Sequence, residues 1–162
     1  MASLAELKSL YEEDTAAWAE QQASALRAAR DGSNQLIDWE NLAEEIEGLR
    51  KSLRYALRSQ IFRIIHHLVK LEYSPAVDPH HGWRRTIRQA RSEIDYILED
   101  SPSLRREIGD LIAKEMKRGF EYAADDLREF DELTRLQLPS LRKATYTQDQ
   151  ILSDWFPPEP KA

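Results

Sequence analysis

The sequence contains no cysteine and only five glycines among its 162 residues. The absence of cysteine excludes disulfide bonds, thiolate nucleophiles and cysteine metal sites, and so few glycines argue against phosphate-binding loops. No apolar run approaches the roughly 18 to 20 residues that a membrane span needs, and the N-terminus lacks the apolar core of a signal peptide. We therefore expect one domain over residues 1–162, located in the cytoplasm and without a membrane segment.

Apolar residues recur at the spacing of amphipathic helices, and no alternating or β-branched run suggests a sheet. We predict an all-α protein, an up-down helical bundle of four main helices with a short third helix and a short C-terminal helix. N-cap residues and prolines mark most helix ends. The predicted helices run from Ser3 to about Gly32, over 39–73, over 83–99, from Ser101-Pro102 to Leu138-Pro139, and from Thr147 with Gln150 onward.

The predicted helix over 39–73 changes character along its length. Its first half carries a narrow apolar seam, whereas the apolar residues of 57–71 cover about half of the circumference. The second half therefore needs more neighbours than the first. The helix over 83–99, joined by the connection 74–82, should supply one by folding back beside residues 57–73 only. The fourth helix would overrun the second and would bend near Gly119 or pack its overhang on the tail or on another subunit.

The net charge of −6 conceals a segregation of charge along the chain. Residues 1–49 carry a formal charge of −8, residues 50–91 a charge of +8, and residues 92–162 a charge of −6. If the second and third predicted helices are neighbours, the middle block forms one basic face. We select as its interaction residues Arg54, Arg58, Arg84, Arg85 and Arg88.

Two interpretations of this basic face stay open. It is either a surface for phosphates or nucleic acid, or it is neutralised internally by carboxylates of the fourth helix, namely Glu121, Asp125 and Asp126. The acidic net charge and the absence of RNA-binding motifs argue against nucleic acid. The first turns of a helix disfavour cations, so the arginines at 84, 85 and 88 need compensation from carboxylates, helix C-terminal carbonyls or a bound anion.

Asp14 also allows two interpretations. If the first helix is unbroken, Asp14 lies inside its apolar stripe between Tyr11 and Trp18, where a carboxylate needs a partner or a raised pKa. Alternatively, Asp14 caps a second helical segment that begins at Thr15, and no functional site is required. The second interpretation is favoured.

The four histidines lie at positions 66, 67, 80 and 81, close to Glu72 and Asp78. A metal site is disfavoured, because adjacent helical residues point about 100° apart and cannot both reach one ion. The sequence also lacks a nucleophile elbow, a Walker-type loop, a zincin helix and a dinucleotide fingerprint. We therefore predict no cofactor and no metal, and we do not favour an enzyme.

An ordered set of short motifs extends over most of the chain. It comprises Tyr11-Glu12-Glu13-Asp14 with Trp18, Glu40-Asn41-Leu42-Ala43-Glu44-Glu45-Ile46-Glu47, His67-Leu68, Tyr73-x-Pro75, Trp83-x-x-Thr86-Ile87, Ser101-Pro102-Ser103-Leu104 and Tyr146-Thr147-x-x-Gln150. In this set the chain resembles an uncharacterised bacterial family, domain of unknown function number twenty-nine. The resemblance implies an all-helical protein without an established activity. Within the matching motifs, Asp14, Asn41, Glu44 and His67 are the candidates for a functional polar cluster.

The sequence thus leaves three functional hypotheses. The first is an interaction or structural module whose basic face or fourth-helix overhang meets an unidentified protein or a second copy of the chain as a homodimer. The second is an enzyme or metal-dependent site that uses Asp14, Asn41, Glu44 and His67 for acid–base chemistry. The third is the binding of phosphate or nucleic acid by the basic face.

Overall fold

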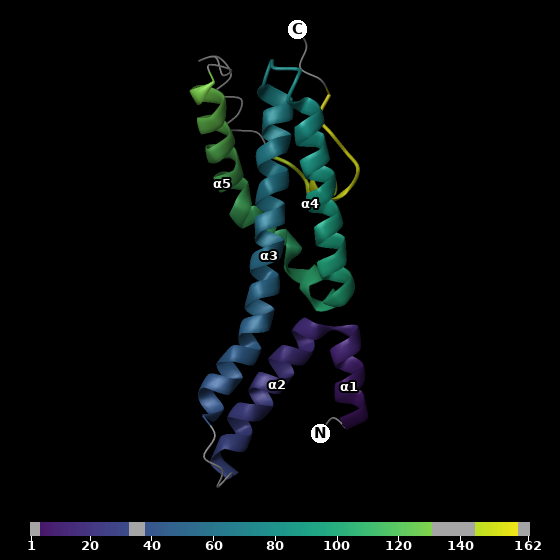
Figure 1. The fold of residues 1–162 in the computed structure, drawn as a ribbon, viewed down its shortest axis with the longest axis vertical. Helices are drawn as coiled ribbons and strands as arrows, with labels where there is room; N and C mark the ends of the chain where they lie inside the picture. The colour runs from purple at the N-terminus through teal and green to yellow at the C-terminus, as the bar shows by residue number, and fades with distance from the viewer. Residues whose placement is uncertain (1–3, 33–37, 131–144, 159–162) are drawn as a thin grey trace. The chain divides into compact units, whose positions relative to one another are not determined.

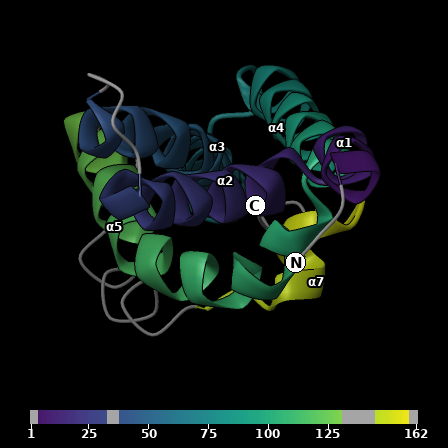
Figure 2. The same cartoon turned by 90° about the horizontal axis from the view of Figure 1, so that it is seen from below.

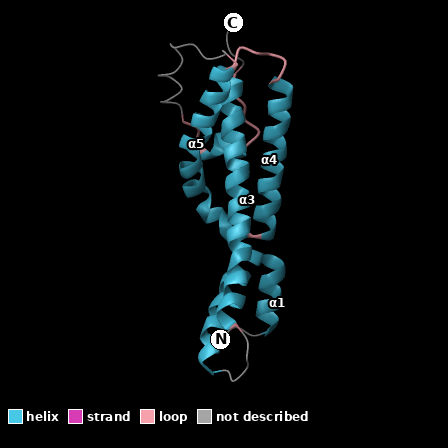
Figure 3. Ribbon diagram, turned by 60° about the vertical axis from the view of Figure 1, so that its left-hand side comes forward, coloured by secondary structure: helices cyan, strands magenta, loops and turns pink. Residues whose placement is uncertain are grey.

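The computed structural model describes residues 4–32, 38–130 and 145–158 (Figure 1). These residues form the helices α1 (Leu4–Glu13), α2 (Thr15–Ala29), α3 (Trp39–Tyr73), α4 (His80–Asp100), α5 (Ile108–Glu129) and α7 (Gln148–Leu152), with 3-10 turns at Arg30–Gly32 and Pro102–Glu107. Figure 3 shows no strand in the part of the chain that it colours. The prediction of an all-α protein is therefore confirmed.

Local signals predicted some helix ends well and others poorly. The bounds of α3 are those predicted, and the Asp38 side chain accepts a hydrogen bond from the Asn41 N–H, as expected of an N-cap. At α7 the Thr147 and Gln150 side chains form the predicted capping box. The predicted ends at Ser3 and at Leu138-Pro139 lie outside the described residues.

Three helix predictions need correction. The single first helix was wrong, whereas the favoured interpretation of Asp14, as the cap of a second segment that begins at Thr15, is confirmed by the break between α1 and α2. The third helix begins at His80, three residues before the predicted start, and ends at Asp100. The residues after Ser101-Pro102 first form a 3-10 turn, so α5 begins only at Ile108. The common reason for the first and third errors is a tertiary contact at Asp14, described below.

The chain divides into two compact units. One unit consists of Met1–Ala56 and Tyr96–Arg106, and the other of Leu57–Asp95 and Glu107–Ala162. In the first unit, α2 lies along the beginning of α3 (Figure 2). Alanines occupy the buried face of α2, at positions 16, 19 and 23, and Ala43 of α3 is buried as well. Side chains this small let helix backbones approach closely, so this unit has a thin core.

The second unit holds most of the large buried side chains. The wide apolar stripe predicted for α3 is buried here, including Leu57, Ile61 and Ile65. Figure 1 shows α4 alongside this part of α3, as the stripe predicted. Helix α5 approaches α3 closely at Gly119, where an added Cβ would lie 2.5 Å from Cγ2 of Ile65. The close crossing explains why glycine occupies a buried position in α5.

Candidate interaction surface

Asp14 joins two helix starts in the first unit. Its Oδ1 accepts a hydrogen bond of 2.8 Å from the Ala17 N–H and thereby caps α2. The same carboxylate accepts hydrogen bonds from the backbone N–H and the hydroxyl of Ser103, in the 3-10 turn. In return, the Ser101 hydroxyl accepts from the Ala16 N–H over 3.2 Å. Both helix starts present partial positive charge, so the structure places Asp14 as a shared cap.

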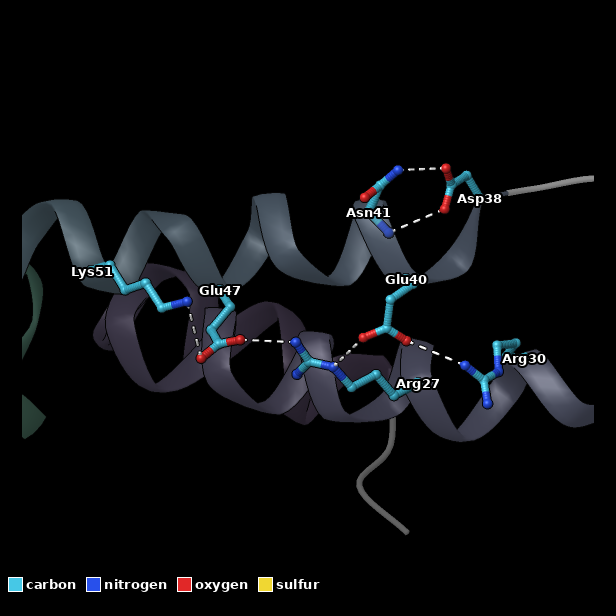
Figure 4. A network of polar contacts seen from close by, with 7 residues as sticks. All are labelled: Arg27, Arg30, Asp38, Glu40, Asn41, Glu47 and Lys51. Atoms are coloured by element: carbon cyan, nitrogen blue, oxygen red, sulfur yellow. Dashed lines mark hydrogen bonds and ion pairs between the residues drawn. The ribbon is translucent and has the colours of Figure 1, made fainter.

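The other three members of the predicted polar cluster lie in different settings. Asn41 donates a hydrogen bond of 2.6 Å to Asp38 (Figure 4), and Glu44 is exposed on α3. His67 belongs to the second unit and is half-buried. No described hydrogen bond joins any two of these four residues. Their joint action in acid–base chemistry stays a prediction, and the cap accounts for the hydrogen bonds that Asp14 forms.

The predicted basic face is divided by its ion pairs. Arg58 of α3 donates a hydrogen bond of 2.7 Å to Glu115 of α5, whose side chain is only 1% exposed. Arg118, one turn along α5, lies 3.4 Å from the other oxygen of Glu115. Arg54 also has an interaction partner. Breaking an ion pair with one fully buried partner is costly, so we remove Arg58 from the candidate surface.

The arginines of α4 differ from those of α3. We call Arg84, Arg85 and Arg88 the arginine row; Arg85 and Arg88 are exposed and Arg84 is half-buried. Within the described ranges, no ion pair joins a carboxylate to any of the three. The first turn of α4 contains no acidic residue. The row is therefore a concentration of positive charge in the second and third turns of α4, beyond the first turn where the helix dipole acts most strongly.

The carboxylates that we expected beside the arginine row pair elsewhere. Asp126 accepts a hydrogen bond of 2.8 Å from Lys70, and the same oxygen lies 3.0 Å from Nε2 of His66. Glu121 pairs with Lys117, and Asp125 with Arg128, both within α5. Of the two interpretations left open, internal neutralisation therefore holds for Lys70 of the basic block, while none of these three carboxylates forms a described ion pair with the arginine row. Their ion-pair partners are Lys70 of α3 and Lys117 and Arg128 of α5.

Burial as well as charge shifts the pKa values of His66, His67 and Asp126. Burial lowers the pKa of His67 to about 4, with the neighbouring His66 and Lys70 acting in the same direction. Burial also lowers the pKa of His66, and the Asp126 carboxylate opposes this effect without cancelling it. Burial raises the pKa of Asp126, but the hydrogen bond and charge of Lys70 outweigh it, so that this pKa is lowered. Both histidines are therefore neutral near pH 7.

The C-terminal segment is anchored on α4 by a buried arginine. Arg91 is 5% exposed and donates hydrogen bonds of 2.8–2.9 Å to the backbone carbonyls of Gln150, Ile151 and Trp155. Burial lowers the pKa of Arg91, against the opposing charge of Asp154. Two of the three carbonyls belong to α7 near its C-terminus, where a cation is favoured. This contact fixes the residues that follow α7.

The anchored segment brings an aromatic ring to the arginine row. The guanidinium carbons of Arg84 and Arg91 each lie 5.0 Å from the centre of the Phe156 ring, and that of Arg88 lies 5.4 Å away. Such distances are those of cation–π contacts. Stacking engages the face of a guanidinium and leaves its N–H edge available to an acceptor. Phe156 therefore contacts Arg84 and Arg88 of the row without neutralising them.

The sequence analysis did not identify Glu115, Arg91 or Phe156 as site residues, although the position of Glu115 indicates a buried charge. Glu115 lies within the apolar stripe of its helix, between Leu111 and Gly119, and a carboxylate in that position needs a cationic partner. Arg91 was counted only as part of the basic block, because backbone carbonyls far along the chain carry no sequence signature. Phe156 was expected merely as part of a short tail.

The described residues offer neither a metal-binding cluster nor a membrane-spanning helix. No group of three or more histidine, aspartate or glutamate side chains there is arranged to hold a metal ion. No helix in that part of the chain has both the length and the apolar character that a membrane crossing requires.

Comparison with known families agrees with the motifs. Residues 10–156 match the family model described as a domain of unknown function, DUF29. The match extends over most of the chain, so the protein belongs to this all-helical class of domains and specifically to the DUF29 family. No curated protein and no solved structure is significantly similar to the chain. The function of the family is unknown, so a functional proposal must come from the structure itself.

Proposed function

We propose that the protein is a helical interaction module that binds an acidic protein segment through the arginine row of α4. The observation that carries this proposal is that Arg84, Arg85 and Arg88 have no carboxylate partner among the described contacts. Other cations of the same unit, including Arg58 and Lys70, do have one. A site that concentrates uncompensated charge in this way favours an anionic partner.

The local electrostatics support carboxylates as the groups bound. Neighbouring guanidinium groups repel one another. A partner carboxylate would relieve this repulsion and would accept charge-assisted, bidentate hydrogen bonds from an arginine. Arg84 and Arg88 are one helical turn apart, so glutamates one turn apart on a partner helix would match their spacing.

Preorganisation of the row adds to the case for binding. Phe156 is held near the arginines because Arg91 binds the carbonyls on either side of the end of α7. Ordering a long side chain on binding costs about 0.5–1.5 kcal/mol. Two arginines already stacked on a ring have lost part of this freedom, so less of the interaction energy is consumed when a partner binds.

An acidic protein segment fits the molecule better than nucleic acid does. The chain carries a net charge of −6, which repels a long polyanion beyond the immediate contact. Nucleic-acid affinity also grows with the number of phosphates contacted, and the row offers only three arginines. A short acidic segment needs no more than such a local patch.

We extend the proposal to the architecture and setting of the module. In this proposal residues 1–162 form one up-down bundle that acts in the cytoplasm. The continuity of α3 and α4 supports it, because each of these helices contributes residues to both compact units without a break. A single cooperative unfolding transition, with coincident fluorescence and circular dichroism curves, is the expected result. Two separate transitions would contradict it.

Fluorescence anisotropy with labelled polyglutamate tests the binding proposal. We expect the full-length protein to bind this probe at low salt and to lose affinity as salt rises, because exposed charges are screened. The double variant Arg85→Glu with Arg88→Glu should weaken binding by about tenfold or more. The matched control reverses two exposed lysines of α5 in the same unit, Lys114→Glu with Lys117→Glu, and should change affinity far less.

Three outcomes of this experiment would overturn the proposal. The first is the absence of polyglutamate binding by the unmodified protein at low salt and at a protein concentration where light scattering finds a monomer. The second is an equal loss of affinity in the arginine and lysine variants, which would indicate non-specific attraction. The third is binding of a labelled single-stranded oligonucleotide in preference to polyglutamate, which would identify the row as a nucleic-acid surface.

A further inference from the structure

The beginning of α3 carries an exposed strip that mixes apolar and acidic side chains. Leu42 is 42% exposed and Leu49 is 46% exposed, and Glu45 between them is exposed as well. Residues separated by three, four and seven positions share one face of a helix, so these three side chains lie together. We call Leu42, Glu45 and Leu49 the leucine strip.

The glutamates in and near the strip differ in whether a cation forms an ion pair with them. Glu47 lies 2.8 Å from Arg27 and 3.6 Å from Lys51, and Glu40 lies within ion-pair distance of Arg27 and Arg30 (Figure 4). Arg27 therefore bridges α2 to two turns of α3, and its hydrogen bond lowers the pKa of Glu47. In the part of the chain described by the structure, Glu45 has no such ion pair.

The leucine strip and the arginine row are complementary in two respects. The strip contributes the carboxylate of Glu45, which has no ion pair in the described part of the chain, whereas the row contributes three arginines without a carboxylate partner among the described contacts. The strip also presents two leucines. The row presents the aliphatic stems of its arginines and the Phe156 ring, which is half-buried. Arginine stems cover apolar surface while their charged ends pair with acids.

From this complementarity we infer that the acidic segment bound by the arginine row is the leucine strip of a second copy of the same chain. The inference rests on the proposed function and names its partner. Glu45 of one copy accepts hydrogen bonds from Arg85 or Arg88 of the other, and Leu42 and Leu49 cover the arginine stems. Contact in both directions closes a dimer, whereas contact in one direction only extends the assembly.

Mass measurements by light scattering at low and high salt test this inference. We expect the unmodified protein to form dimers or larger species that dissociate as salt rises. Glu45→Arg should yield monomers, and so should Arg85→Glu with Arg88→Glu. Mixing these two variants should restore association, because each supplies the contact that the other lacks. Leu42→Ser with Leu49→Ser should weaken association without removing its salt dependence.

The neighbouring glutamate provides a matched control. Glu44 is also exposed on α3, but adjacent helical residues point about 100° apart. Glu44→Arg changes the net charge as Glu45→Arg does and should leave the mass of the assembly unchanged.

The results separate this inference from the proposed function. A protein that binds polyglutamate through the row but stays monomeric at high concentration and low salt would overturn the inference alone. Association that persists in the arginine variant, or a variant mixture that stays monomeric, would also overturn it. A protein that neither binds polyglutamate nor associates would overturn both.

Discussion

Replacing Gly119 of α5 by alanine should destabilise the protein by about 1–2 kcal/mol, although alanine is the better helix former. The added Cβ would lie 2.5 Å from Cγ2 and 3.0 Å from Cβ of Ile65, and 3.5 Å from the backbone nitrogen of His66. Carbon atoms prefer about 3.5–4.0 Å, so α5 or Ile65 must shift. Overpacking of a core costs about 1–3 kcal/mol, and removing a helical glycine recovers at most about 1 kcal/mol.

Urea unfolding followed by circular dichroism would measure this effect as a lower midpoint with an unchanged slope. Gly48→Ala in α3 is the control, because nothing lies within 4 Å of the Cβ that it would add. This substitution should stabilise the protein by about 0.5–1 kcal/mol. The two glycine variants should therefore differ by about 1.5–3 kcal/mol, with opposite signs relative to the unmodified protein.

A double-mutant cycle with Ile65→Ala assigns the cost to the contact itself. Ile65→Ala removes Cγ2 and leaves a cavity, which alone costs about 2–5 kcal/mol. In that background the 2.5 Å contact is gone and only the 3.0 Å contact to Cβ of residue 65 remains, so Gly119→Ala should cost less than in the unmodified protein and the coupling between the two positions should be about 1 kcal/mol. Equal stability of Gly119→Ala and Gly48→Ala, or a coupling near zero, would refute the close crossing of α3 and α5.

Two further substitutions test the buried polar groups. Asp14→Ala should lower the free energy of unfolding by about 2–4 kcal/mol, because α2 loses its cap and the Ser103 N–H loses its acceptor. Asp14→Asn should cost less than Asp14→Ala. If urea unfolding shows a loss below about 1 kcal/mol for Asp14→Ala, the shared cap is contradicted. Since the pKa of His67 is about 4 when folded and about 6.5 when unfolded, the unfolded chain binds more protons as pH falls from 6.5 to 4, and stability decreases over that range. After discounting for the partial exposure of the ring, His67 should contribute about 1 kcal/mol to the stability lost between pH 7 and 5. His67→Gln should remove that part of the decrease, and the control His81→Gln, at an exposed position, should not. Equal dependence of stability on pH in the unmodified protein and both variants would refute the assignment.

The sequence predicted structure well where the signals are local. The start of α3 follows from Asp38 and its end from Ser74-Pro75, and the cap of α7 lies within four residues. The widening of the apolar stripe of α3 at Leu57 likewise predicted where larger side chains are buried. Each of these signals is read within one or a few helical turns, so no tertiary information is needed.

The role of Asp14 shows where such signals stop being sufficient. The apolar periodicity continues through this position and did not reveal the break, whereas the residue type favoured a cap of a second segment at Thr15. The carboxylate is held by the Ala17 N–H, as that cap requires, and also by Ser103, which is 89 residues away. The motif Ser101-Pro102-Ser103 was identified as a helix start, but its pairing with Asp14 depends on the folded chain.

The arginine row illustrates the same limit for charge. Composition located the basic block between two acidic ones, but it could not decide which cations would be compensated. In the folded unit, Glu115 forms an ion pair with Arg58, and Asp126 contacts both Lys70 and His66. Arg84, Arg85 and Arg88 are left without an acid in these contacts, and Arg84 and Arg88 contact the Phe156 ring instead. A cationic surface is what remains after the internal pairs are formed, and for this reason only Arg84, Arg85 and Arg88 of the five predicted residues carry the proposal.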